Sequence, residues 1–167
     1  MSFDLHFQPC RFDGTTEKRF NPFTKQMQDV PRNEPLSPEE ASAVLDVLKR
    51  AGAEGPDEEG CHLVRFDDGS SAEIFAKSVE TGCMVAIRGA GVTPALAKLL
   101  FDVMVAGRWV LLGEEEVVLA PSHECLKGTP KAFGQVVVAH SPDDIGAVLS
   151  GGYEAWRKYR SRALRES

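Results

Sequence analysis

The sequence lacks the features that mark exported, membrane-spanning and metal-binding proteins. Its apolar stretches end well before the roughly 20 residues that a membrane-spanning helix needs. The opening residues, MSFDLHF, have no basic patch followed by an apolar run, so no secretory signal is predicted. The four cysteines, Cys10, Cys61, Cys83 and Cys125, form no C-x-x-C pair. We therefore expect a cytoplasmic protein with four reduced cysteines, no metal, no cofactor and no membrane contact.

Catalytic motifs are also scarce. No serine lies in a G-x-S-x-G elbow. The Gly89–Thr93 loop could present backbone N–H groups to a phosphate, but Pro94 stands where the third glycine of a dinucleotide fingerprint belongs. Cys125 lies in a polar segment and is the cysteine expected to be exposed enough to react. Whether the protein is an enzyme stays open, and a non-catalytic protein is favoured because no set of catalytic roles can be assigned.

The composition is that of a globular protein. The chain has 167 residues, of which 43% are hydrophobic and 26% charged, which predicts a single domain over 1–167. The net charge is −6, and residues 153–167 carry five basic against two acidic side chains, so the body of the protein is still more acidic. An acidic body repels nucleic acid and favours cationic partners.

Apolar periodicity predicts an α+β fold. Residues 2–8 alternate as a half-buried strand, and Ser37-Pro38-Glu39-Glu40 begins a helix with a capping box. Residues 11–35 show no period and contain three prolines, so this long segment is predicted to be irregular. Further strands are expected at 62–66, 71–76, 83–88, 109–112, 117–120 and 136–139, and helices at 37–51, 93–106 and 142–165, the last broken around Gly151-Gly152. Hairpins between neighbouring strands predict a mainly antiparallel sheet of about six or seven strands with three helices.

Several short motifs resemble those of small uncharacterised bacterial proteins. They are the opening MSFDLHF, Asn21-Pro22-Phe23-Thr24, the Asp67-Asp68-Gly69 turn with Ala72-Glu73-Ile74-Phe75 after it, and Gly107-Arg108-Trp109-Val110. Some such proteins resemble the immunity partners of bacterial toxins. The resemblance implies a bacterial protein that acts by contact and carries no active site to this chain.

The leading hypothesis is therefore a non-catalytic protein-binding domain, as a monomer or homodimer, whose partner is a cationic protein such as a toxin. Acidic side chains in turns reach solvent and can steer such a partner. Phe20 and Phe23 are candidate apolar anchors because aromatics in a loop are not needed for a helix or strand core. The predicted contact residues are Asp57, Glu58, Glu59, Glu114, Glu115, Glu116, Phe20 and Phe23. The alternative is a small enzyme or small-molecule binder that uses the Gly89–Thr93 loop or Cys125.

Overall fold

The computed structural model of the protein describes residues 2–21, 24–89, 91–113, 117–128 and 135–166. Within these ranges the chain forms nine strands, four α-helices and one 3-10 turn, which confirms the α+β class. The strands are β1 Ser2–Pro9, β2 Phe12–Asn21, β3 Gln26–Asn33, β4 Cys61–Arg65, β5 Ser71–Phe75, β6 Cys83–Arg88, β7 Trp109–Leu112, β8 Val117–Ala120 and β9 Gln135–Val138. The helices are α1 Pro38–Arg50, α2 Pro94–Gly107, α3 His123–Gly128 and α4 Pro142–Glu166, and the 3-10 turn is η1 Val79–Thr81.

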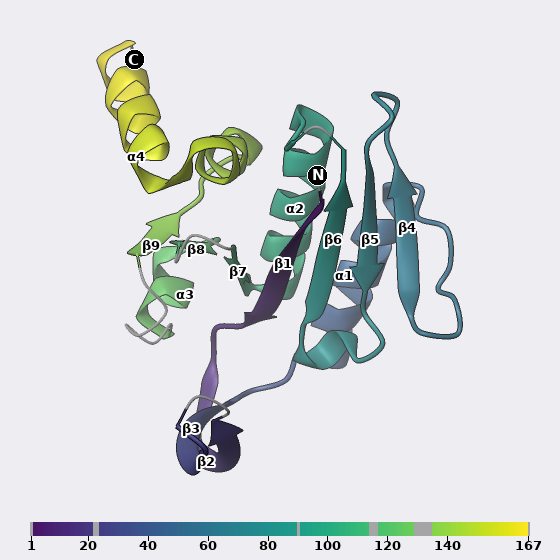
Figure 1. Ribbon diagram of the computed structural model, residues 1–167, viewed down its shortest axis with the longest axis vertical. Coiled ribbons are helices and arrows are strands. Elements are labelled where there is room, and N and C mark those ends of the chain that lie inside the picture. Colours follow the sequence, from purple (N-terminus) through teal and green to yellow (C-terminus); the bar gives the residue numbers. More distant parts are fainter. Residues whose placement is uncertain (1, 22–23, 90, 114–116, 129–134, 167) are drawn as a thin grey trace.

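Seven strands form one sheet, in the order β4-β5-β6-β1-β7-β8-β9 (Figure 1). β1, the first strand of the chain, lies at the centre and pairs antiparallel with both β6 and β7. The remaining pairs are antiparallel except β8 and β9, which run parallel. The sheet is therefore mixed, antiparallel over most of its width with one parallel pair at the β9 edge.

The main hydrophobic core lies between one face of the sheet and the helices α1 and α2, which stand behind the sheet in Figure 1. Leu5 and Phe7 of β1 point into this core, and Trp109 of β7 is fully buried beside Phe7, with ring centroids 5.8 Å apart. α4 packs against α2 and adds Ile145 and Val148 to the core. A second, smaller apolar cluster lies on the opposite face, where α3 contacts β8 and β9.

The two core helices begin at the caps that the sequence predicts. The Ser37 side chain accepts the N–H of Glu40, and the Glu40 carboxylate accepts the N–H of Ser37, which completes the capping box of α1. Thr93 caps α2 by accepting the N–H of Leu96 at 3.3 Å. Because these bonds satisfy backbone donors that the first helical turn leaves open, both helices start within a residue of the predicted position.

Most of the described residues between 11 and 35 lie in strands, so the prediction of an irregular segment is wrong for them. β2 and β3 form a separate two-stranded antiparallel sheet, which we call the arm and define as residues 12–33. The arm hangs below the main sheet in Figure 1. Most of its described residues are exposed on both faces. Its strands therefore lack the alternation of apolar and polar residues by which a strand is predicted from sequence.

The number and continuity of the helices also differ from expectation. The described part of the chain has four α-helices rather than three, because the short α3 was not predicted. α4 runs from Pro142 to Glu166 through Gly151 and Gly152, so the predicted break is wrong. A glycine in a helix costs only about 1 kcal/mol relative to alanine, which the rest of a long helix can offset.

Candidate functional site

The arm carries the most exposed large apolar side chains among the described residues. Phe20 and Met27 are direct cross-strand partners in the β2–β3 register, and they are 59% and 56% exposed. Side chains opposite each other on one face of a sheet are in contact distance, so the two form one small apolar patch. Phe20, one of the two anchors that the sequence predicts, belongs to this patch, whereas its partner Met27 was not singled out.

Charged side chains border this patch. Lys18 and Asp29, two residues from Phe20 and Met27 respectively, pair across the strands at 3.1 Å and lie on the same face. On the other face the amide of Asn21 donates to the Gln28 side-chain oxygen at 3.0 Å. An apolar centre with a polar rim is the arrangement found in protein–protein contact surfaces.

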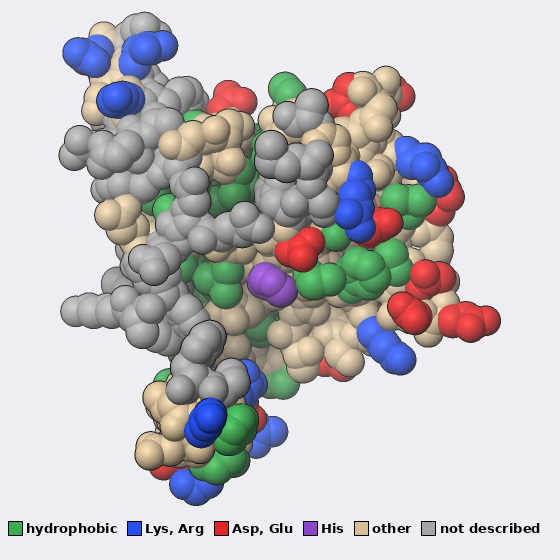
Figure 2. Space-filling model, in the orientation of Figure 1, with side chains coloured by type: hydrophobic (Ala, Val, Ile, Leu, Met, Phe, Trp, Pro, Cys, Tyr) green, Lys and Arg blue, Asp and Glu red, His purple; other side chains and the backbone are tan. Residues whose placement is uncertain are grey.

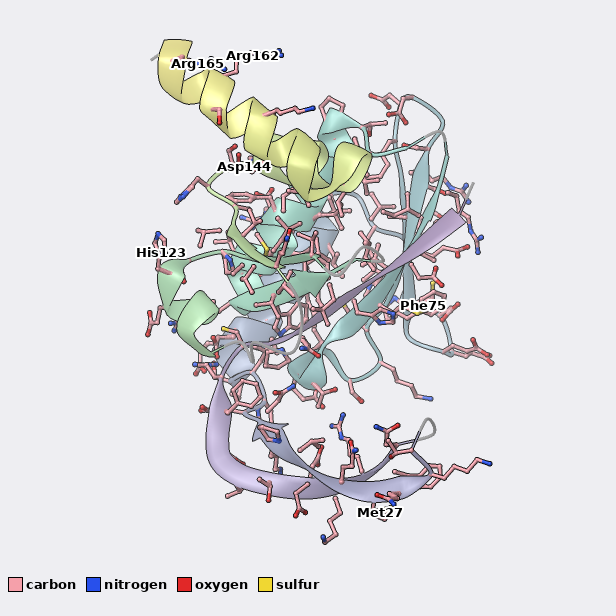
Figure 3. The ribbon with its side chains drawn as sticks, turned by 60° about the vertical axis from the view of Figure 1, so that its left-hand side comes forward. Met27, Phe75, His123, Asp144, Arg162 and Arg165 are labelled. Carbon is pink, nitrogen blue, oxygen red and sulfur yellow. The ribbon has the colours of Figure 1, made fainter. Side chains whose placement is uncertain are left out.

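The root of the arm is attached to the body by polar bonds. The guanidinium of Arg11 pairs with the Glu40 carboxylate at 2.6 Å, and the N–H of Glu34 donates to the Arg11 carbonyl at 2.8 Å. Burial raises the pKa of Glu40, but bonds from Ser37 and Arg11 outweigh it and leave the pKa below its ordinary value. Figure 3 shows the arm extending from this root to the side of the sheet on which Phe75 lies, with Met27 near its far end.

The predicted acidic contact residues fall in two places. Asp57, Glu58 and Glu59 are all exposed in the loop before β4. The Asp57 carboxylate also accepts the N–H groups of Glu59 and Cys61, at 2.9 and 2.8 Å, so it holds the loop together. Glu58 and Glu59 are therefore the side chains available to a partner. The other predicted contacts, Glu114–Glu116 and Phe23, lie outside the described residues.

Among the described residues, no helix covers the outer face of the β4–β5–β6–β1 half of the sheet (Figure 1). The register aligns Cys61, Phe75, Met84 and His6 in one row across β4, β5, β6 and β1, and we call this row the open face. The first three are half-buried and His6 is exposed. Figure 2 views this side, where hydrophobic side chains gather next to a histidine, with charged side chains around them. The alternation within β1 was visible in the sequence, but the alignment of β1 with the other strands was not.

The end of the Gly89–Thr93 loop that meets α2 lies beside a carboxylate. There the Thr93 side chain donates a hydrogen bond to Asp68 at the N-terminus of the helix. Bonds from Ser70 come first in holding the pKa of Asp68 below its ordinary value, and the Thr93 bond adds to them. A fixed negative charge at this helix terminus satisfies the helix dipole and repels a phosphate.

Cys125 is not the exposed thiol that the sequence suggested. It is 3% exposed, as is Cys10, and the sulfur atoms of Cys125 and Cys10 lie 3.5 and 3.3 Å from the carbonyl oxygen of Arg108. The two thiols are also hydrogen-bonded to each other. Their juxtaposition was invisible in the sequence because it depends on the pairing of β1 with β7 and on the packing of α3. All four cysteines are thiols rather than disulfides in the structure.

A groove of about 720 Å³ runs between α1 and α2. Its floor is mainly apolar, with Val47, Phe66 and Leu99 among the lining residues, and Arg50 and Lys98 also border it. Lys98 pairs with Asp102 one helical turn away. Such a volume is within the range of small-molecule pockets, so this groove has room for a small molecule.

Among the described residues, no three His, Cys, Asp or Glu side chains are grouped so that they could hold a metal ion. The rings of His123 and His140 lie near each other, with centroids 6.4 Å apart, while Cys125 points to Cys10 instead. Every helix in the described part of the chain is too short or too polar to cross a bilayer.

No protein-family model, no curated protein and no solved structure matches this chain.

Proposed function

We propose that this protein is a non-catalytic binding protein that acts by contact with another protein through the arm. The exposed Phe20–Met27 pair carries the proposal. Two large apolar side chains, each more than half exposed, stand side by side on an element outside the main sheet. Neither side chain belongs to the hydrophobic core clusters of the protein, so the apolar surface of the pair is available to a partner.

The structure of the arm supports the same interpretation. A two-stranded hairpin is marginally stable alone in water, and the arm is joined to the body mainly through its root. Burying the rest of Phe20 and Met27 in a complex contributes about 1–2 kcal/mol each, by the usual relation of apolar area to free energy. A partner that covers the arm would therefore both stabilise its two strands and bury the side chains of Phe20 and Met27.

The charge of the body favours a cationic partner. Glu58 and Glu59 are exposed and belong to a protein with net charge −6. Acidic groups of this kind speed the encounter with a positively charged protein more than they strengthen the final complex. An immunity protein that neutralises a cationic bacterial toxin is the form of this function that the sequence resemblance favours.

The test removes the apolar patch and leaves the strands intact. Phe20→Thr with Met27→Thr keeps strand-forming residues, and Leu45→Gln, which removes a 40% exposed apolar side chain from α1, is the matched control. Each protein is immobilised and exposed to extract of the native cell, and captured proteins are identified by mass spectrometry and titrated as pure components. We expect the double variant to weaken binding about 30-fold or more, equal to about 2 kcal/mol, and the control to bind like wild type.

A second measurement isolates the electrostatic part. Glu58→Lys with Glu59→Lys leaves Asp57 to hold the loop and should lower the association rate and its dependence on salt. Equal binding by the arm variant and wild type would overturn the proposal. An unchanged association rate for the loop variant would remove the cationic partner from it.

A second candidate function is small-molecule binding in the groove between α1 and α2, favoured by its volume and apolar lining. Arg50 and Lys98 at its border suit an apolar molecule with an acidic group. Long-chain carboxylates that raise the melting temperature of wild type but not of Leu99→Gln would support it. No shift at saturating ligand would exclude it.

A further inference from the structure

Cys10 and Cys125 are brought together at the root of the arm. Cys10 lies in the two-residue link between β1 and β2, and Cys125 lies in α3. Both sulfur atoms approach one carbonyl oxygen, that of Arg108, at 3.3 and 3.5 Å, and both side chains belong to the small apolar cluster with Val110, Val118 and Ala120. The two thiols and the carbonyl between them therefore come from three separate segments of the folded chain.

We propose that Cys10 and Cys125 form an oxidisable thiol pair that a peroxide converts into a disulfide. In the first step the Cys125 thiolate attacks hydrogen peroxide, the O–O bond breaks, and Cys125 becomes a sulfenic acid while hydroxide leaves and is protonated to water. In the second step the sulfur of Cys10 attacks that of Cys125, the S–O bond breaks, and a second water leaves with the Cys10 proton. The two thiols lose two electrons and the peroxide gains them.

The surroundings assign different roles to the two sulfurs. The hydrogen bond from Cys10 lowers the pKa of the Cys125 thiol despite its burial, and Ser122 and the charge of Arg108 add to the effect. The same contact raises the pKa of Cys10, and burial raises it further. Cys125 is thus the attacking thiolate and Cys10 the resolving thiol, since the thiolate is the reactive form.

The other two cysteines lack such a partner among the described residues. Cys83 points into the main core, where burial alone raises the pKa of its thiol to about 12. Cys61 lies on the edge strand β4, and burial and nearby acidic groups raise the pKa of its thiol. Cys61 is half-buried and so more accessible than Cys125. If exposure decided which cysteine is oxidised, Cys61 would react first, whereas the proposed pairing predicts oxidation of Cys10 and Cys125.

The test maps the disulfide in the wild-type protein. Reduced, folded protein is treated with hydrogen peroxide, acidified, alkylated in denaturant and digested with trypsin, which cuts after Arg11, Arg108 and Lys127. We expect a cross-linked peptide that joins residues 1–11 to 109–127, a protein mass lower by two hydrogens, and recovery of both thiols with dithiothreitol. Cys61 and Cys83 should be recovered in alkylated form.

Two variants separate the roles. Cys61→Ser with Cys83→Ser should give the same cross-link at the same rate. Cys10→Ala should leave a sulfenic acid on Cys125, trapped by a 1,3-diketone, and no disulfide. The proposal is overturned if the wild-type cross-link is absent, joins Cys61 or Cys83, or forms as fast in urea-unfolded protein as in folded protein. These readouts involve no partner protein, so they succeed or fail independently of the proposed binding function.

Discussion

Gly107 tests whether packing or helix propensity decides the stability of α2. It is the last residue of α2, and a Cβ added there would lie 2.7 Å from Cδ2 of the Trp109 indole, with Cε2 and Cε3 at 3.0 and 3.1 Å. Trp109 is fully buried in the main core and rests against Phe7, so it has little room to withdraw. Gly107→Ala therefore forces either the indole or the helix end to move.

Two opposing terms set the size of the effect. Replacing glycine by alanine in a helix gains up to about 1 kcal/mol from backbone entropy, and less at the last residue. Overpacking a filled core costs about 1–3 kcal/mol. The expected result is a net destabilisation of about 1–2 kcal/mol, which lowers the melting temperature by about 2–8 °C in a protein of this size.

The matched control is Gly146→Ala in α4. A Cβ at this position meets only the Cβ of Ala97, at 3.9 Å, which is an ordinary contact. The same substitution should then raise the melting temperature by about 2–4 °C. Circular dichroism during heating and urea titration measures both variants. A Gly107→Ala protein as stable as wild type, or more so, would refute the packing argument.

Three further results are expected. Burial lowers the pKa of His62 from its ordinary 6.5, and the charge of Asp57 partly offsets this, so the unfolded chain takes up a proton more readily than the folded state. The free energy of unfolding should therefore fall as pH drops below 6.5. In urea titrations at several pH values, His62→Gln should weaken this dependence of the midpoint on pH. The depressed pKa of Glu40 gives stability that is present above its ordinary value of 4.5 and is lost as pH falls further, so Glu40→Gln should be less stable at neutral pH and less sensitive to acid. Ser37→Ala removes the cap of α1 and should cost about 1 kcal/mol, measured by urea titration, whereas Ser42→Ala on the exposed side of the same helix should not destabilise.

Where local chemistry decides the structure, the sequence predicted it well. Strands β6, β7 and β8 lie at the predicted residues, since each is a short apolar run bounded by glycine or charged residues. α1 and α2 were placed by their Ser-Pro and Thr-Pro starts, which act within one helical turn. The parallel pairing of β8 with β9 was missed because it depends on how the chain crosses between them, which no short motif records.

The candidate site was only partly visible. Phe20 could be singled out because an aromatic residue lay in a segment without a period, but its pairing with Met27 follows from the arm's register. The arm itself escaped prediction because strands that bury neither face leave no hydrophobic pattern. The thiol pair and the open face are likewise products of strand pairing, which joins residues far apart in the sequence.

The central position of β1 has a consequence for how the protein is made. β1 is synthesised before both of its partners, so it can pair with β6 only after residues 83–88 have been made, and with β7 only after residues 109–112. Until then both of its edges offer unpaired N–H and C=O groups, and long-range pairings of this kind are slow to form. β4, β5 and β6 precede β7 in the chain, so this half of the sheet can assemble on β1 during synthesis. The C-terminal strands then complete the sheet on a template that already exists.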